Sequence, residues 1–317
     1  MKPVKLYFAA GGGAYMSILE KCGVRNLLFS YAYSDILYDW IKRKEPSDDG
    51  NFNLIIDSGA FTVWRKGKEV NIQEYINFLH QIKNSCKGNI RVVNLDVIPG
   101  KFGETKKIHK DKLKDNSIVE EAAKKGYENL IIMLQNGIEP IHVFHQGESF
   151  KWLDKMVEKV GYIGISPAND VYTYINKKKW LDDVFDYLEK HQIKVNTHGF
   201  GVWSPNILLE YPWTSCDSLS WLMLGVYGNV YYVKGGYKTP QFNRDFNTIK
   251  IIPVSQKRKN TINPSLIKYY EKEGYTEADL KDTKKRVEIN VKFFLALEKW
   301  INKEKENFSY STKNRLL

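Results

Sequence analysis

Residues 54–82 read LIIDSGAFTVWRKGKEVNIQEYINFLHQI and contain one complete unit of the expected fold. The short apolar run Leu54–Asp57 ends on an aspartate and is typical of a buried strand. Apolar side chains then recur at the spacing of one helical face, at Ile72, Ile76, Leu79 and Ile82. A strand followed by an amphipathic helix predicts a β/α unit.

The same alternation recurs through residue 217. The predicted strands are Leu6–Ala10, Asn26–Tyr31, Leu54–Asp57, Val92–Val97, His142–Gln146, Tyr162–Ser166, Val195–His198 and Thr214–Asp217. Helical patterns lie at 34–44, 72–86, 116–136, 149–159, 177–191 and 205–211. Eight such strands predict the α/β class and a (β/α)8 barrel of the TIM type. A doubly wound open sheet is the alternative, but Gly11-Gly12-Gly13 lacks the dinucleotide-binding spacing and predicts only a tight turn.

After residue 217 the alternation stops. We therefore predict a catalytic barrel domain at 1–225 and, at 226–317, a basic aromatic loop region with C-terminal helices packed on the barrel. Within the second region, 228–238 is expected to form a hairpin or loop, 239–262 to be irregular, and helices to begin at Pro264. Thr276 and Asp279 have the spacing of a capping box that opens one long helix. Its buried stripe is expected to consist of Val287, Val291, Phe294, Leu297 and Ile301.

Cysteine usage and hydropathy exclude several classes of protein. The three cysteines, Cys22, Cys86 and Cys216, are far apart and form no Cys-x-x-Cys pair, so neither a disulfide framework nor a zinc site is predicted. No cofactor is expected. No apolar run is long enough to cross a bilayer, so we expect no membrane partner and a cytoplasmic protein.

Positive charge is concentrated near the C-terminal third. The chain carries a net charge of +11, and residues 232–262 hold seven basic residues against Asp245 alone, a net +6. Aromatic residues run through or beside this segment, a combination that suits a nucleic acid whose bases can stack. The candidate phosphate contacts are Lys234, Lys238, Arg244, Lys257, Arg258 and Lys259. A solvated loop that keeps the protein soluble is the alternative.

Polar side chains stand where the predicted strands end. They are Asp57, Asp96, Gln146, Ser166, His198 and Asp217. Active residues of this barrel type gather at the C-terminal ends of the strands, and paired carboxylates suit reactions that pass through a cationic sugar. Helix capping is the structural alternative for each aspartate, and a satisfied structural histidine is the alternative for His198. Strand alternation predicts that His145 points away from Gln146, and Trp64, Trp203 and Trp221 are expected to pack or to stack on a flipped base.

At these residues the chain resembles a known family over roughly residues 50–220. Asp57-Ser58-Gly59-Ala60-Phe61 resembles the Asp-Ser-Gly-Gly-Phe signature of tRNA-guanine transglycosylases, and Gln146-Gly147 is similar to their Val-Gln-Gly segment. Gly164 stands where their glycine-rich base-binding strand falls. The segment 198–202, His-Gly-Phe-Gly-Val, resembles their Met-Gly-Val-Gly-Thr segment, and Asp217 fits their Phe-Asp-Cys nucleophile motif.

The resemblance implies that a guanine base is exchanged for a free 7-deazaguanine base through a covalent enzyme–sugar intermediate. Asp217 would be the nucleophile and Asp57 the general acid and base, while Asp96 and Gln146 read the base. The implied substrate site also includes Ser58, Gly59, Phe61, Gly147, Gly164, His198 and Gly199.

Two departures indicate which branch of that family the chain resembles. The family's zinc site is absent, because no cysteine follows residue 217, and Ser-Leu-Ser-Trp at 218–221 also differs. Both departures resemble the divergent phage and bacterial branch that modifies DNA, so DNA is expected over tRNA. If a phage encodes the protein, the resemblance implies the host cytoplasm as its location. The alternatives are an enzyme acting on tRNA, an inactive nucleic-acid-binding barrel, and a barrel hydrolase that acts on a small nucleoside or sugar. The sequence does not specify the oligomeric state.

Overall fold

The computed structural model describes residues 1–9, 13–44, 52–101, 111, 114–167, 174–254 and 262–307. The chain divides into two compact units. The first unit comprises residues 1–25, 202–212 and 216–317, and the second comprises 26–201 and 213–215. Residue 10, Gly11 and Gly12 of the predicted turn, and Lys257, Arg258 and Lys259 lie outside the described residues.

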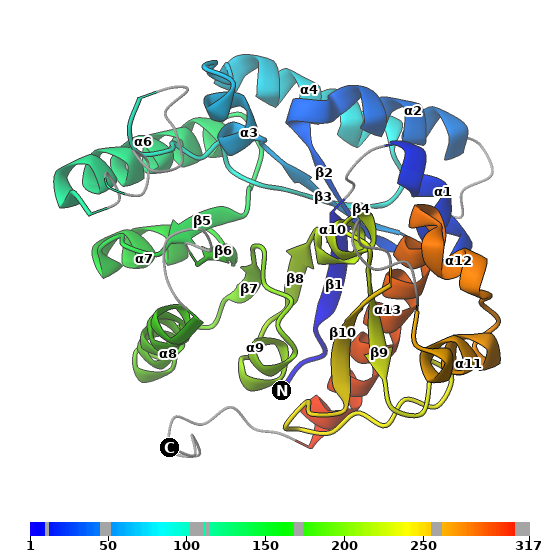
Figure 1. Ribbon diagram of the computed structural model, residues 1–317. Coiled ribbons are helices and arrows are strands. Elements are labelled where there is room, and N and C mark those ends of the chain that lie inside the picture. Colours follow the sequence, from blue (N-terminus) through cyan, green and yellow to red (C-terminus); the bar gives the residue numbers. More distant parts are fainter. Residues whose placement is uncertain are drawn as a thin grey trace. The chain divides into compact units, whose positions relative to one another are not determined.

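Eight strands form one sheet and alternate with helices, so the predicted α/β class and (β/α)8 architecture are confirmed (Figure 1). The strands are β1 (Lys5–Ala9), β2 (Asn26–Ser30), β3 (Asn53–Asp57), β4 (Asn89–Val92), β5 (His142–His145), β6 (Tyr162–Ser166), β7 (Asn196–Gly199) and β8 (Ser215–Ser218). Each lies at or next to a predicted position.

The helices between these strands also follow the predicted pattern. They are α1 (Gly13–Lys21), α2 (Ser34–Lys44), α3 (Ala60–Arg65), α4 (Ile72–Ser85), α6 (Asn116–Gln135), α7 (Phe150–Val157), α8 (Tyr174–Lys190) and α9 (Pro205–Glu210), with a 3-10 turn η1 at Tyr31–Tyr33. Helix α4 begins where the Asn71 side chain accepts hydrogen bonds from the N–H groups of Gln73 and Glu74. The short helices α1 and α3 are additional to the predicted set.

The second unit contains six strands in parallel register. Strands β2, β3 and β4 pair consecutively, as do β5, β6 and β7. A parallel bridge between Val93 and Ile141 joins β4 to β5. Ile141 N donates to Val92 O at 2.7 Å, and Asn94 N donates to Ile141 O at 2.9 Å. The C-terminal ends of these strands therefore meet at one edge.

Strand β4 is displaced from its predicted position. The apolar residues at 92–97 favoured a strand there, but regular pairing ends at Val92. After the bridge at Val93, the Asn94 side chain bonds to helix α6 and the chain leaves the sheet. Asp96 consequently lies on a segment beyond the strand. Strand β4 itself begins at Asn89, where the polar residues do not form the apolar run that predicts a buried strand.

The first unit includes the C-terminal region, drawn from yellow to red in Figure 1. After α10 (Ser220–Val226), strand β9 (Asn229–Val233) pairs antiparallel with β10 (Ile249–Pro253). The expectation that 239–262 is irregular is wrong for β10, whose isoleucines favour an extended strand. Helix α11 (Pro264–Lys272) begins at the predicted proline, with Asn263 as its N-cap.

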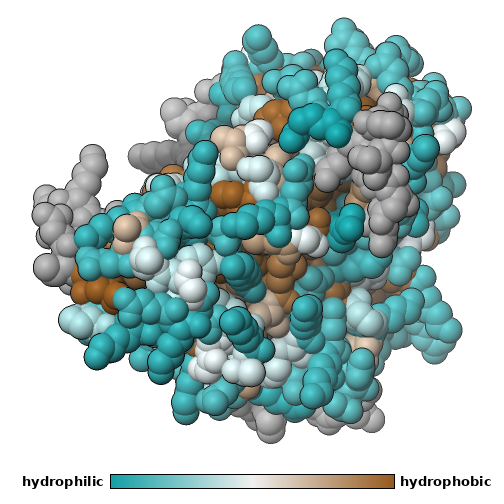
Figure 2. Space-filling view, turned by 90° about the vertical axis from the view of Figure 1, so that its right-hand side faces the viewer, coloured by the Kyte–Doolittle hydropathy of each residue, from teal (hydrophilic) through white to brown (hydrophobic). Residues whose placement is uncertain are grey.

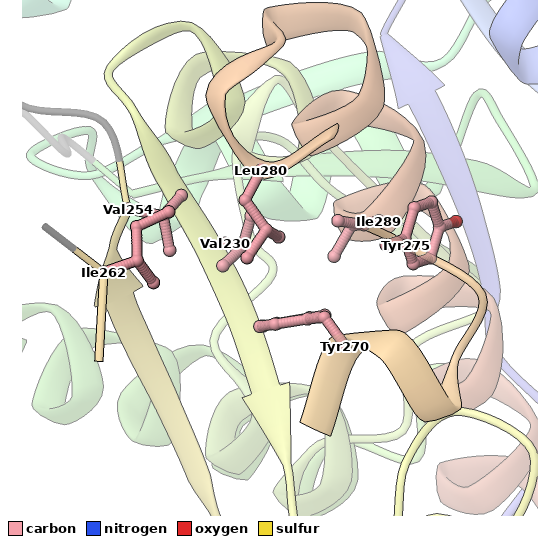
Figure 3. Close-up of a cluster of buried hydrophobic side chains, with 7 residues drawn as sticks. All are labelled: Val230, Val254, Ile262, Tyr270, Tyr275, Leu280 and Ile289. Carbon is pink, nitrogen blue, oxygen red and sulfur yellow. The ribbon is translucent and has the colours of Figure 1, made fainter. Parts of the chain in front are cut away.

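Behind β9 and β10 lies a small apolar core of its own (Figure 3). It consists of Val230, Val254, Ile262, Tyr270, Tyr275, Leu280 and Ile289, each at most 8% exposed. At 25 cal/mol per Å2 each fully buried large side chain contributes roughly 1.5–3 kcal/mol. This core fixes β9, α11 and the following helices as one body.

The capping box at Thr276 and Asp279 is confirmed, but it opens a short helix, α12 (Glu277–Lys281). The long helix α13 (Thr283–Glu306) has its own N-cap, Asp282. The predicted stripe of α13 is buried from Val287 to Ile301. Arg286 of α13 is 3% exposed and links α13 to α10 and α12, because it donates to the carbonyls of Gly225, Leu280 and Lys281.

Hydrophilic side chains cover most of the face seen in Figure 2, with small hydrophobic areas between them. Among the described residues, no helix has the length and apolarity needed to cross a membrane.

Candidate active site

The turn after β3 holds Asp57 at the C-terminal edge of the second unit. Asp57 Oδ2 accepts a hydrogen bond from Gly59 N at 2.9 Å, and Ser58 is 1% exposed. Gly59 has a φ of 69°, and a Cβ atom there would lie 2.7 Å from the Cβ of Ala32. Only glycine fits this position without strain. Asp57 itself is half-buried, so its carboxylate reaches the edge while the turn fixes its direction.

Tyr75 of α4 joins the ends of β3 and β4. Its fully buried hydroxyl lies 2.9 Å from Val93 O and 3.2 Å from Ile56 O, the carbonyls to which it donates. Burial raises the pKa of Tyr75 well above 10, and the negative charges of Asp57 and Asp96 raise it further. Because Asp57 directly follows Ile56 and Asp96 lies three residues after Val93, the Tyr75 hydroxyl joins the two segments that carry these carboxylates.

Asp96 is paired with a histidine that the sequence did not single out. Asp96 Oδ2 lies 3.3 Å from His145 Nε2, and Glu148 Oε1 lies 3.0 Å from His145 Nδ1. The imidazole thus joins two largely buried carboxylates, while it is itself 34% exposed. Burial lowers the pKa of His145, but the two carboxylates raise it by more, so the net pKa lies well above 6.5.

The sequence predicted that His145 points away from Gln146, and in the structure its imidazole contacts Asp96 and Glu148, whereas the Gln146 side chain lies near Asn176 O. Strand β5 ends at His145, and beyond it the chain turns through Gly147, whose φ is 111°. Glu148 N donates to His145 O at 3.1 Å, which brings the glutamate back onto the imidazole. The alternation rule does not apply past the end of a strand. The signal available in the sequence was the i, i+3 spacing of His145 and Glu148.

A second histidine of β5, His142, has a pKa that is shifted in the opposite direction from that of His145. His142 is 5% exposed, and burial lowers its pKa to about 4. Its Nδ1 lies 2.8 Å from the amide nitrogen of Asn94, which also donates to Gly126 O at 2.9 Å. A neutral imidazole can accept this hydrogen bond. His142 therefore belongs to the packed layer beneath the edge, while His145 is the charged member at the edge.

Gln146 and Phe61 lie at accessible positions. Gln146 N donates to Ser166 O at 3.1 Å, and its side chain lies 3.5 Å from Asn176 O. Phe61 is 38% exposed, and its ring stacks on Trp64 with centroids 6.0 Å apart. Trp64, Trp203 and Trp221 are at most 4% exposed, so packing is the role that their burial supports.

Gly164 and His198 lie in a packed interior layer. A Cβ atom on Gly164 would lie 2.5 Å from the Phe200 ring, so the glycine makes room for that phenyl group. His198 is 0% exposed, and its Nδ1 lies 2.5 Å from Ser215 Oγ. Tyr162 shares that hydroxyl at 2.5 Å. These contacts, and the buried Gly199 beside them, fit the structural alternative for His198.

Asp217 belongs to the first unit. It lies in β8 between Cys216 and Ser218 and is 8% exposed. Ser218 Oγ accepts from Ser220 N at 3.0 Å, which begins the turn into α10. Asp217 thus stands near the C-terminal end of its strand, as the sequence predicted for a reactive carboxylate.

The basic segment has a different structure from the one expected. Its aromatic rings are used in packing: Tyr231 stacks on Phe293 at 4.1 Å, and both Phe242 and Phe246 contact Trp300. Among the predicted cations, Arg244 pairs with Glu304 at 3.1 Å, while Lys234 and Lys238 are exposed. Stacking of bases on these interleaved rings is therefore not supported.

In the described ranges, no group of three or more His, Cys, Asp or Glu side chains is arranged to hold a metal ion. Cys22 and Cys86 are half-buried, and Cys216 is buried. Neither a protein-family model nor a curated protein matches the chain. A function must therefore be inferred from the chemistry of the site.

Proposed function

We propose that this protein is a guanine transglycosylase-like pentosyltransferase that exchanges a guanine of nucleic acid for a 7-deazaguanine base. The observation that carries the proposal is that Asp57 and Asp96 follow the ends of β3 and β4, which the buried Tyr75 hydroxyl joins by donating to Ile56 O and Val93 O. Asp96 is in addition tied to a cationic histidine. Carboxylates with unequal surroundings suit separate roles in proton transfer and base recognition.

In the proposed reaction, a carboxylate oxygen of Asp217 forms an ester bond to C1′ of the sugar as the bond from C1′ to guanine N9 breaks. Asp57 donates a proton to the departing base. The incoming base then loses its N9 proton to Asp57 and forms a bond to C1′, which releases the Asp217 carboxylate. The ester splits one difficult displacement into two easier ones.

Asp96 supports base recognition in this scheme. An ionised carboxylate accepts hydrogen bonds from the N–H groups of a guanine-like edge. The imidazolium of His145 keeps a positive charge beside Asp96 and directs its second oxygen, so His145 and Glu148 act as positioning residues. Gln146 can add a further polar contact from the next position along the chain.

The test is base exchange with radiolabelled guanine, run side by side on DNA and tRNA. We expect label in DNA, because the chain resembles the branch that modifies DNA. Label in tRNA alone would overturn the choice of polymer but keep the chemistry, whereas label in neither would overturn the proposed function. Asp57→Asn should lower turnover by several orders of magnitude, and Asp183→Asn, at an exposed position of α8, is the matched control.

The nucleophile is tested by trapping. Without an incoming base, the wild-type protein should form an adduct with nucleic acid that survives denaturation. Asp217→Asn keeps nearly the same shape and should form no such adduct. An adduct formed equally well by the variant would remove Asp217 from this role.

A further inference from the structure

An open groove of about 510 Å3 lies in the first unit, between α13 and the segment that follows β9. Its cationic lining consists of Lys238, Lys292, Lys299 and Lys303, and its other notable members are Glu273 and Trp300. Three of the lysines come from α13 at spacings of seven and four residues, which places them along one helical face.

The charge of this groove is mostly uncompensated. Glu273 is the single carboxylate in the lining, and it accepts a hydrogen bond from Tyr237 N at 3.2 Å. Lys292 pairs with Glu288 at 3.1 Å. In the part of the chain that the structure describes, Lys238, Lys299 and Lys303 form no salt bridge and are exposed. These three ammonium groups therefore give the lining a positive charge that a bound anion would neutralise.

The dimensions favour a chain of anions over a single anion. From 292 to 303 the helix rises about 16 Å at 1.5 Å per residue. That length matches several consecutive phosphates of a nucleic-acid strand. Single small anions would engage one or two lysines and leave the others unsatisfied.

Trp300 adds an aromatic wall. Phe242 and Phe246 hold its ring at centroid distances of 5.6 and 5.5 Å, and the indole also lines the groove. A fixed aromatic surface beside a row of cations is the arrangement that binds single strands, because a base can stack on the ring while the phosphates meet the lysines. Duplex bases are stacked on each other and do not offer that face.

We propose that this groove binds the phosphodiester backbone of a single-stranded segment of the nucleic-acid substrate, with one unpaired base on Trp300. The inference rests on the proposed function for the identity of the ligand. It assigns phosphate binding to lysines of α13, which lie outside the basic segment 232–262 that the sequence pointed to. Base exchange at C1′ requires a nucleotide to leave its stack, so a groove that binds single-stranded nucleic acid serves that chemistry.

The experiment measures binding of a labelled single-stranded oligodeoxynucleotide to the full chain over a range of salt concentrations. The test variant carries Lys238→Gln, Lys299→Gln and Lys303→Gln. The control carries Lys268→Gln, Lys272→Gln and Lys284→Gln, which are exposed, belong to the same unit and lie outside the groove. Both variants lose the same charge, and circular dichroism should show that both fold.

Each phosphate contact on a single strand contributes about 0.7 to the slope of log affinity against log salt, so the test variant should flatten that slope by about two. The control should keep the wild-type slope. Trp300→Leu should weaken binding roughly fivefold to a hundredfold and keep the slope. Polyglutamate added at the same concentration of negative charges as the oligonucleotide should not displace it, because polyglutamate has neither phosphates nor bases.

If the test variant binds the oligonucleotide as its control does, the groove does not bind the phosphate backbone and the proposal is refuted. Displacement of the oligonucleotide by polyglutamate would refute it as well. This result is independent of catalysis. If the wild type shows the predicted slopes but exchanges no base, the groove is supported and the proposed function fails. If base exchange occurs and both triple variants bind the oligonucleotide alike, the proposed function is supported and the proposed binding role of the groove is refuted.

Discussion

The pairing of His145 with Asp96 and Glu148 predicts a specific dependence of stability on pH. Replacing His145 by Gln removes the cation and keeps a polar side chain. Two contacts are lost, at 3.3 and 3.0 Å. Hydrogen bonds to charged groups contribute about 1.5–3 kcal/mol each, but the one-third exposure of this imidazole admits screening by water. We therefore expect a loss of about 1–2 kcal/mol in the free energy of unfolding at pH 6.

The sign of the pH effect follows from the raised pKa of His145. A group whose pKa is raised by folding stabilises the folded state fully below its unfolded pKa, which is about 6.5 for histidine. That stabilisation disappears as the pH rises through the folded-state pKa. The difference between wild type and His145→Gln should therefore be largest near pH 6 and should shrink on the alkaline side.

Guanidinium unfolding of both proteins over a series of pH values measures this difference. His80→Gln, at an exposed position of α4, is the control and should show no such trend. A second readout is exchange activity, where His145→Gln should raise the KM for the incoming base about tenfold with a smaller change in kcat. A stability difference that stays constant with pH would refute the reasoning about the imidazolium.

Three further predictions test the neighbouring parts of the chain. Gly59→Ala should destabilise the fold by about 2 kcal/mol more than Gly67→Ala in guanidinium unfolding, because both have positive φ but only Gly59 lacks room for a Cβ atom; equal losses would contradict the packing argument. Asp96→Ala should lower selectivity for guanine-like bases by roughly 1–3 kcal/mol in competition assays, and unchanged selectivity would remove it from base recognition. Elemental analysis should find well under one zinc per chain, and stoichiometric zinc that tracks with activity would contradict this expectation.

The barrel was predictable because each β/α unit carries its own local signal. Apolar runs mark the strands, and stripes such as the one that begins at Ile72 mark the helices. What local patterns could not supply is where a strand stops. The bridge at Val93 and the bond from Asn94 to α6 end β4 early, and both depend on residues distant in the sequence.

The carboxylates of the candidate site could be proposed from the sequence, whereas the contacts of His145 could not. Asp57 and Asp96 follow apolar runs and can be found by reading strand ends. His145 was set aside because alternation was extended one residue beyond the strand. Its role depends on the turn through Gly147, which returns Glu148 to the imidazole, and a turn of this kind follows from backbone geometry rather than from residue type.

In the motifs that resemble the transglycosylase family, packing explains the glycines, whereas the carboxylate at Asp57 needs a separate argument. Packing alone accounts for Gly59, which Ala32 crowds, and for Gly164, which admits the Phe200 ring. Neither glycine therefore argues for a ligand. In the turn after β3, an asparagine oxygen at position 57 would accept the same hydrogen bond from Gly59 N that Asp57 accepts. Asp57→Asn therefore keeps this hydrogen bond of the turn and removes the acid that the proposed reaction needs, so loss of exchange in a folded variant would support the proposed role of Asp57.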